Sequence, residues 1–158
     1  MKKISVILGS VSDKEVMAKA FAMLERFNIP YSKHVISAHR ALDHLSDYVK
    51  SLEAEEVGVI IAGAGGAAAL PGVIAALTVI PVIGVPIKSA SLHGLDSLFS
   101  IVQMPTGVPV ATVAIDGAAN AALLAAEILA VANPALREKL IAYREEIKAA
   151  ALASGKEL

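Results

Sequence analysis

The sequence predicts a three-layer αβα protein, in which an open parallel sheet lies between two layers of helices. First, strand-length apolar segments alternate with helix-length segments along the chain, the order typical of a parallel sheet. Second, the strand segments are rich in β-branched residues and nearly free of charge, as expected of strands buried on both faces. Third, hydrophobic residues make up 56% and charged residues 18% of the 158 residues, which excludes a disordered chain. This length suits a single domain covering residues 1–158.

The first half of the chain contains three predicted strands separated by two predicted helices. The strands are the apolar segments 4–9, 31–36 and 57–63. Apolar residues recur at helical spacing in the first intervening segment, at Val16, Met17, Ala20, Phe21, Leu24 and Phe27. In the second segment they recur in the same way, at Leu42, Leu45, Val49 and Leu52. We therefore expect helices over 13–27 and 41–53.

The second half continues the alternation and then adds two helices. We expect a helix at 67–77, a strand at 80–86, a short helix at 92–102 and a strand at 108–115. The segment 118–131 is helical and almost uniformly apolar. Asn133 and Pro134 then supply an N-cap and a first-turn proline, which predict a charged amphipathic helix to about residue 153.

The apolar helix over 118–131 must be covered on more than one side. A helix that is apolar all round is buried all round, and the sheet covers only one side of it. A subunit interface would cover the remainder, which leads us to expect a homo-oligomer. The C-terminal helix of the same chain would serve equally well, and the sequence leaves both possibilities open.

The segment 57–87 contains no charged residue and resembles a membrane span in hydropathy alone. A spanning helix needs about 20 continuous apolar residues. Glycines and prolines interrupt the segment, at Gly63, Gly65, Gly66, Pro71, Pro81 and Pro86. Two buried strands around a short helix fit better, so we expect no membrane association.

Composition excludes several other classes of protein. The net charge of -1 and the pI near 6.4 provide no basic field to attract nucleic acid. The absence of cysteine excludes disulfides, thiolate nucleophiles and cysteine metal sites. The N-terminal apolar stretch is too short for a signal peptide, so we expect a cytoplasmic protein.

The loop after the first strand, GSVSD at 9–13, suits a phosphate group. Its glycine allows backbone N–H groups to face outward, and its hydroxyl groups stand at a helix N-terminus. An alternative is ordinary helix capping, because Ser12 and Glu15 have the spacing of a capping box.

Two further loops follow the next two strands, and ligands of open α/β sheets bind beyond these carboxyl ends. In SAHR, Arg40 offers a guanidinium to a phosphate, and His39 can exchange a proton near neutral pH. In AGAGGAAALPG, at 62–72, the small residues allow a ligand to approach the backbone. The alternative for His39 and Arg40 is that both are solvated surface residues. The alternative for the small residues at 62–72 is that they allow tight helix–sheet packing. Together the three loops predict a small phosphorylated ligand.

These motifs resemble one family. GSxSD, SAHR, AGAGGAA-LPG, GVP, LxGLDSLxSIVQMPxGVPVATVAI and NAALLAAEIL are similar to the N5-carboxyaminoimidazole ribonucleotide mutases, the bacterial-type catalytic subunit of phosphoribosylaminoimidazole carboxylase. The resemblance covers about residues 4–131. It implies a flavodoxin-like doubly wound sheet, a homo-octamer, and a carboxylate transfer in purine biosynthesis. It also implies that the reaction uses no metal or other cofactor.

The resemblance also implies roles for individual residues. His39 corresponds to the general acid and base, while Ser10, Ser12, Ser37 and Arg40 would hold the phosphate. Asp13 would bind the ribose hydroxyls, and the third loop would surround the migrating carboxylate. The full set of implied substrate-binding residues is Gly9, Ser10, Ser12, Asp13, Ser37, Ala38, Arg40, Gly63, Ala64, Gly65, Gly66, Ala67, Ala68 and Leu70.

One departure from the family pattern affects the third loop. The usual GGAAHLPG reads GGAAALPG here, so Ala69 replaces a histidine. Besides an active mutase, this leaves open a protein that binds substrate without turning it over. Direct carboxylation of aminoimidazole ribonucleotide by carbon dioxide is a further alternative.

The remaining polar residues support no other chemistry. The histidines lack the spacing of a metal site, so we expect none. We expect His34 on the strand surface, His44 on a solvated helix face and His93 at a turn or an interface. Lys88 and the Asp96-Ser97 pair can reach the predicted pocket, but the sequence does not decide whether they do.

Overall fold

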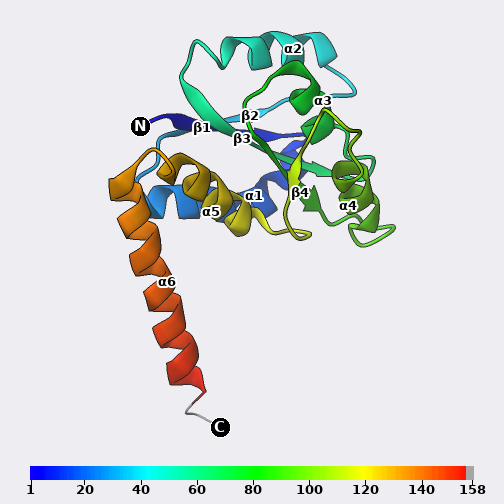
Figure 1. The fold of residues 1–158 in the computed structure, drawn as a ribbon. Coiled ribbons are helices and arrows are strands. Elements are labelled where there is room, and N and C mark those ends of the chain that lie inside the picture. Colours follow the sequence, from blue (N-terminus) through cyan, green and yellow to red (C-terminus); the bar gives the residue numbers. More distant parts are fainter. Residues whose placement is uncertain (156–158) are drawn as a thin grey trace.

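The computed structural model describes residues 1–155, which form a five-stranded parallel sheet with helices on both faces (Figure 1). The strands are β1 (Lys3–Leu8), β2 (Tyr31–Val35), β3 (Val57–Gly65), β4 (Val82–Ile87) and β5 (Ala111–Thr112). The helices are η1 (Val11–Asp13), α1 (Lys14–Arg26), α2 (Leu42–Ser51), α3 (Leu70–Leu77), α4 (Leu95–Val102), α5 (Ala118–Ala130) and α6 (Pro134–Ser154). The strand order β2-β1-β3-β4-β5 is that of the flavodoxin-like doubly wound fold, as predicted.

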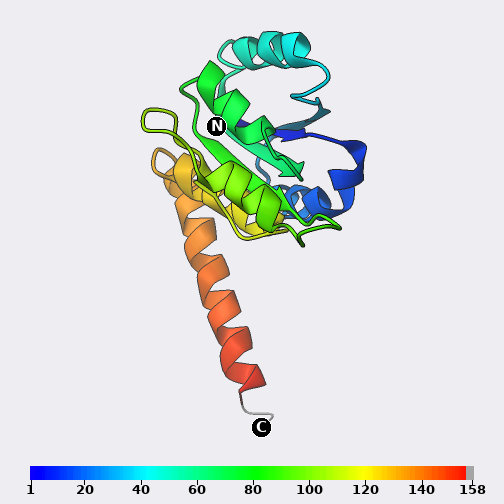
Figure 2. The same cartoon turned by 90° about the vertical axis from the view of Figure 1, so that its right-hand side faces the viewer.

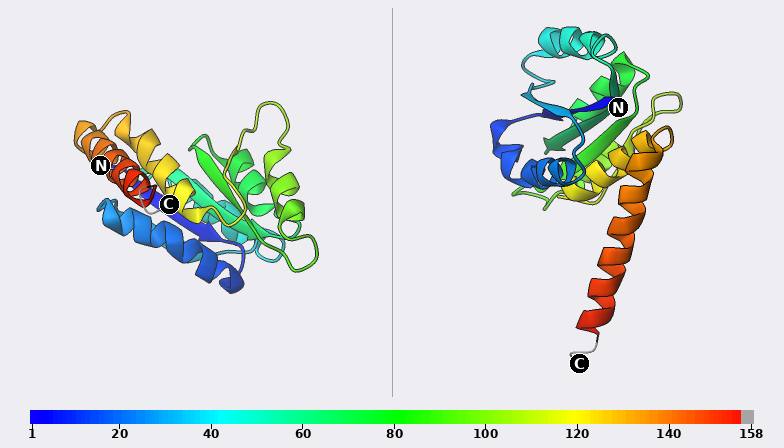
Figure 3. Two further views of the ribbon diagram at one scale, coloured as in Figure 1. Left: turned by 90° about the horizontal axis from the view of Figure 1, so that it is seen from below. Right: turned by 90° about the vertical axis from the view of Figure 1, so that its left-hand side faces the viewer.

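Alternate residues of each strand face opposite sides of the sheet and create two hydrophobic cores. In β3, Val59 and Ile61 pack with α1 and α5, whereas Ile60 and Ala62 pack with α2, α3 and α4. Figure 3, in the view from below, shows α1 and α5 side by side beneath the sheet. Because both faces are covered, the central strands contain almost no polar residues.

Most predicted elements are confirmed to within a few residues, but the strand expected over 108–115 is wrong in extent. Only Ala111 and Thr112 pair with β4, opposite Ile83 and Gly84. Pro109 has no N–H to donate to a ladder. Beyond β5 two separate bonds hold the chain near β4: the Val113 N–H donates to the Gly84 carbonyl at 3.2 Å, and the Asp116 N–H donates to the Pro86 carbonyl at 2.8 Å. The predicted strand is therefore reduced to β5, a two-residue strand at the edge of the sheet.

Two helices begin later than predicted because their first residues form turns. The helix expected from residue 67 starts at Leu70, with Ala69 as its N-cap. The helix expected from residue 92 starts at Leu95, since His93 and Gly94 both adopt positive φ, 54° and 95°. This confirms the turn at His93. In contrast, the predicted cap of α6 is present, because the Asn133 side chain accepts a hydrogen bond from the Leu136 N–H at 3.1 Å.

Helix α6 packs on the body only through its first part and then projects from it (Figures 1 and 2). Tyr143 meets Phe27 edge to face, and Arg144 forms an ion pair with Glu127 at 2.7 Å. Beyond these contacts Ile147 and Leu152 are exposed. Helix α6 therefore covers part of α5, but the half-buried leucines of α5 show that its apolar surface is not completely covered within residues 1–155. None of the described helices is both long and apolar enough to span a membrane.

Candidate active site

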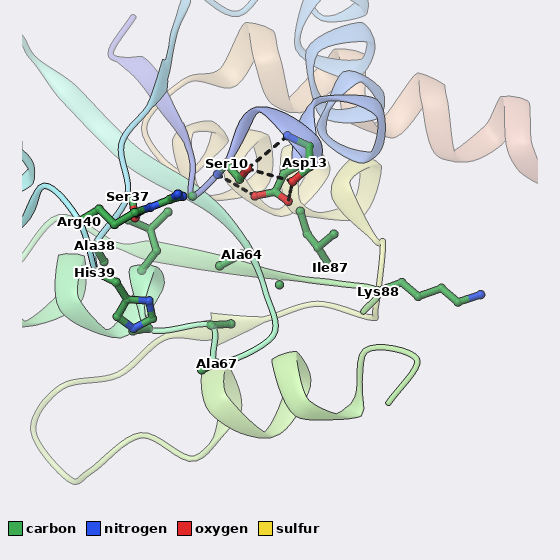
Figure 4. Close-up of a pocket in the computed structure, with 16 residues that line it drawn as sticks. Ser10, Asp13, Ser37, Ala38, His39, Arg40, Ala64, Ala67, Ile87 and Lys88 are labelled. Atoms are coloured by element: carbon green, nitrogen blue, oxygen red, sulfur yellow. Dashed lines mark hydrogen bonds between the residues drawn. The ribbon is translucent and has the colours of Figure 1, made fainter. Parts of the chain in front are cut away.

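A cavity of about 460 Å³ lies at the carboxyl edge of the sheet (Figure 4). Leu8, at the end of β1, pairs with Val35 of β2 on one side and with Gly63 of β3 on the other. The chain passes from β1 to β2 in one direction and from β3 to β4 in the other, so the cavity lies where the strand order reverses. Its lining residues are Gly9, Ser10, Ser12, Asp13, Ser37, Ala38, His39, Arg40, Ala64, Gly65, Ala67, Ala68, Ala69, Leu70, Ile87 and Lys88.

The first loop is held together by Ser10 and Asp13. The Asp13 carboxylate accepts a hydrogen bond from the Ser10 N–H at 3.0 Å, and the Ser10 hydroxyl accepts one from the Ser12 N–H at 3.3 Å. The Ser12 hydroxyl also donates to the Ser10 hydroxyl at 2.9 Å. The capping arrangement is thus built on Ser10 and Asp13, not on Ser12 and Glu15 as the sequence alternative proposed. This bonding places the two serine hydroxyls together at the cavity.

Asp13 is the one buried carboxylate of the site. Burial raises the pKa of its carboxyl group, while the hydrogen bonds from the Ser10 N–H and the Ser12 hydroxyl oppose that effect. The residue is only 7% exposed but still lines the cavity. A buried carboxylate held in this way is suited to accept hydrogen bonds from the hydroxyl groups of a ligand.

The second loop is a tight turn that places His39 and Arg40 at the cavity. The Ser37 carbonyl accepts hydrogen bonds from the N–H groups of Arg40 and Ala41, and the Ser37 hydroxyl accepts one from Arg40 Nε at 3.2 Å. In Figure 4 the Arg40 guanidinium extends toward the Ser10 loop, and the His39 ring lies toward Ala67. Both side chains are exposed, so a ligand can reach them.

The third loop connects β3 to α3 with small residues only. Gly66 adopts a positive φ of 65°, and the Ala68 N–H donates to the Gly66 carbonyl at 2.9 Å. Gly63 and Gly66 do not line the cavity, unlike the other residues predicted for this loop. Gly63 is instead covered by Met17, whose sulfur lies 2.6 Å from the position of a Cβ. The structure thus assigns Gly63 to packing.

Two lining residues were not predicted as site residues. Ile87 is the last residue of β4 and pairs with Gly65 of β3. Its position at the carboxyl end of a predicted strand could have indicated that it lines the cavity. Lys88 follows it, and the structure decides the open question by placing this residue at the cavity. Asp96, by contrast, is bonded to Ser89 at 2.8 Å and does not line the cavity.

The other histidines lie away from the cavity. His34, expected on the surface, is half-buried with its ring 4.3 Å from that of Tyr48. His44 is exposed on α2, as expected. Within residues 1–155 there is no group of three or more histidine, aspartate or glutamate side chains placed to hold a metal ion.

The site therefore combines one exposed imidazole, two cations, one buried carboxyl group and several hydroxyl groups at a topological switch point. A profile of AIR carboxylases matches residues 3–150. The chain belongs to the AIR carboxylase family. The match covers the three loops of the site, so the family assignment and the cavity concern the same part of the chain.

Individual relatives support the family assignment over nearly the whole chain. The N5-carboxyaminoimidazole ribonucleotide mutase of Pyrococcus abyssi is 61% identical over 148 residues, which are 94% of this chain and 85% of that protein. The enzyme of the same name from Thermotoga maritima is 53% identical, with 94% and 86% covered. The crystal structure of Treponema denticola PurE has a TM-score of 0.91 and 28% identity, with 100% and 99% covered. The fold of this AIR carboxylase family member is therefore shared along its length.

Proposed function

We propose that this chain, acting as a single domain, converts N5-carboxyaminoimidazole ribonucleotide to 4-carboxy-5-aminoimidazole ribonucleotide in purine biosynthesis. The observation that carries the proposal is the meeting of His39, Arg40 and the Ser10–Asp13 loop in one cavity. A relative with 61% identity is named an N5-carboxyaminoimidazole ribonucleotide mutase. The reaction class is an isomerisation, because the same carboxylate leaves one atom of the substrate and joins another.

The phosphate of the substrate would lie between the first loop, which carries Ser10 and Ser12, and the second loop, which carries Ser37 and Arg40. The positively charged Arg40 guanidinium can donate two parallel hydrogen bonds to the phosphate. The hydroxyls of Ser10, Ser12 and Ser37 are further hydrogen-bond donors. The N-terminal end of α1 beside this loop adds a favourable dipole. In this orientation Asp13 accepts hydrogen bonds from the ribose, and the imidazole ring of the substrate extends toward His39.

His39 would move one proton in each direction. As the carbamate C–N bond breaks, His39 donates a proton to the exocyclic nitrogen, and carbon dioxide is released into the cavity. Ring carbon 4 then attacks the carbon dioxide to form the new C–C bond, and His39 takes the proton that carbon 4 loses. The proton count is unchanged over the cycle, so the proposed step needs no other reactant.

The small third loop would retain the carbon dioxide. Gly65, Ala67 and Ala68 line the cavity with backbone and methyl groups, which offer no polar side-chain atom to hold water beside the reacting carbon. Ala69, at the N-cap of α3, also lines it and has no polar side-chain atom. If a histidine here assists the reaction in relatives, turnover in this chain is lower by roughly 100-fold.

We further propose a homo-oligomer, with the octamer implied by the family resemblance as its form and the cytoplasm as its location. Helix α4 exposes Leu95, Phe99 and Val102 along one side, and Phe99 is 58% exposed. The free part of α6 exposes Ile147 and Leu152. Such apolar stripes on ordered helices are typical of surfaces that pack against another subunit.

The test compares the unchanged protein with its Ala69→His variant. Both are assayed for conversion of N5-carboxyaminoimidazole ribonucleotide, and binding of the product is measured by calorimetry. Turnover by the unchanged protein supports the proposal, and equal rates would show that His39 suffices. Turnover by the variant alone, with binding by both, would make the unchanged chain a substrate-binding protein. Absence of binding by both would contradict the proposal.

A further inference from the structure

We infer that Lys88 is the residue that recognises the carboxylate of the substrate, an inference that rests on the proposed function. The cavity is lined by two cationic side chains, Arg40 from the β2 side and Lys88 from the β4 side. The proposed substrate also carries two anionic groups, a phosphate on the ribose and a carboxylate on the base. The number of cations therefore matches the number of anionic groups.

Arg40 cannot serve both anions. In the order β2-β1-β3-β4, three strand spacings separate the two cations. At about 4.8 Å per spacing, the backbones of β2 and β4 are roughly 14 Å apart, so Lys88 would reach a carboxylate beside His39 only with its side chain extended across the third loop. The Arg40 guanidinium is directed toward the phosphate loop and bonded to Ser37 (Figure 4). The third loop, which lies between them, contains no charged residue. Of the two cations that line the cavity, Lys88 is therefore the one that remains for the carboxylate of the substrate.

The backbone of Lys88 is fixed from two sides. Its N–H donates to Oδ1 of Asp116 at 2.9 Å, and the Asp116 N–H donates in return to the Pro86 carbonyl at 2.8 Å. On the other side the Ser89 hydroxyl accepts hydrogen bonds from Leu92 and Gly94 and donates to Asp96 at 2.8 Å. The base of the side chain is therefore held at the cavity rim without any ligand.

The side chain itself is free to turn. In Figure 4 it extends away from His39, and Lys88 is exposed. No hydrogen bond or ion pair to its ammonium group occurs among residues 1–155. Rotation about its side-chain bonds would be needed to bring the ammonium group over the cavity, where a carboxylate would hold it. Lys88 would thus discriminate carboxylated from decarboxylated ribonucleotide.

The experiment measures, by calorimetry at low salt, the Kd of 4-carboxy-5-aminoimidazole ribonucleotide and that of aminoimidazole ribonucleotide, which lacks the carboxylate. In Lys88→Gln we expect the Kd of the carboxylated ligand to rise about five- to tenfold, and that of the other ligand to stay unchanged. Lys88→Met should behave likewise, while Lys88→Arg should retain the preference. Lys19→Gln, an exposed lysine on α1 outside the cavity, is the matched control.

The outcomes separate this inference from the proposed function. If the unchanged protein binds both ligands and Lys88→Gln keeps the same ratio of Kd values, Lys88 has no such role although the function stands. An equal rise in both Kd values would indicate a general structural effect and would also overturn the inference. If the unchanged protein binds neither ligand, the proposed function fails, and the inference fails with it.

Discussion

Arg40 Nε donates a hydrogen bond of 3.2 Å to the hydroxyl of Ser37, at the turn that follows β2. The same turn is closed by the bond from the Ala41 N–H to the Ser37 carbonyl, 2.9 Å. Ser37 therefore orients the guanidinium as well as the backbone that carries it. This relationship places a fixed positive charge beside the hydroxyl groups of the first loop.

Arg40→Ala should weaken binding of the carboxylated ribonucleotide by roughly 10- to 100-fold, because the phosphate loses a charge-assisted hydrogen bond. Calorimetry measures the change. The corresponding nucleoside, which has no phosphate, serves as the control and should bind both proteins equally. An unchanged Kd for the ribonucleotide would contradict the proposed role of Arg40.

His39→Asn should abolish turnover while product binding stays within about threefold, since the amide preserves the size of the side chain but cannot exchange a proton. Turnover is followed by the absorbance of the product, and binding by calorimetry. His44→Asn, on the exposed side of α2, is the matched control and should leave the rate unchanged. A near-normal rate in His39→Asn would remove the general acid and base from the proposed mechanism.

The oligomer proposal predicts a particle mass several times 16.3 kDa in multi-angle light scattering. Phe99→Glu should lower that mass, because it places a charge in the exposed stripe of α4. Glu53→Gln, on the exposed turn after α2, should not change it. A monomeric mass for the unchanged protein would mean that α4 and the free part of α6 remain exposed in solution.

The half-buried His34 predicts a pH dependence of stability. Burial lowers its pKa in the folded protein, Glu55 raises it, and Lys3 and His44 lower it slightly further. Between the unfolded pKa of about 6.5 and the lower folded value, the unfolded chain binds more protons, so the free energy of unfolding falls as the pH falls.

Urea titrations at pH 7 and pH 5 measure this change. His34→Gln should lose part of the pH dependence, because the amide does not titrate. His44→Gln, at an exposed histidine that makes the smallest of the named contributions to the His34 shift, should keep most of it. Equal pH dependence in the unchanged protein and in His34→Gln would show that another group is responsible.

Local patterns were enough to predict most of the fold. The alternation of apolar segments indicated a parallel sheet, and loops at consecutive strand ends indicated the cavity. The strand over 108–115 failed because an apolar β-branched run has the same pattern whether or not its backbone groups pair. Pairing depends on the position of the neighbouring strand, which the run itself does not contain.

By itself, the sequence determined the family motifs, the order of strands and helices, and the residue types that reach the carboxyl edge of the sheet. Only the tertiary structure decided that the capping box joins Ser10 and Asp13, not Ser12 and Glu15, and that Gly63 packs against Met17. It also decided that Lys88 joins Arg40 at one cavity. The reason is geometric: parallel strands far apart in the chain end at one edge, and distances across that edge depend on register and twist.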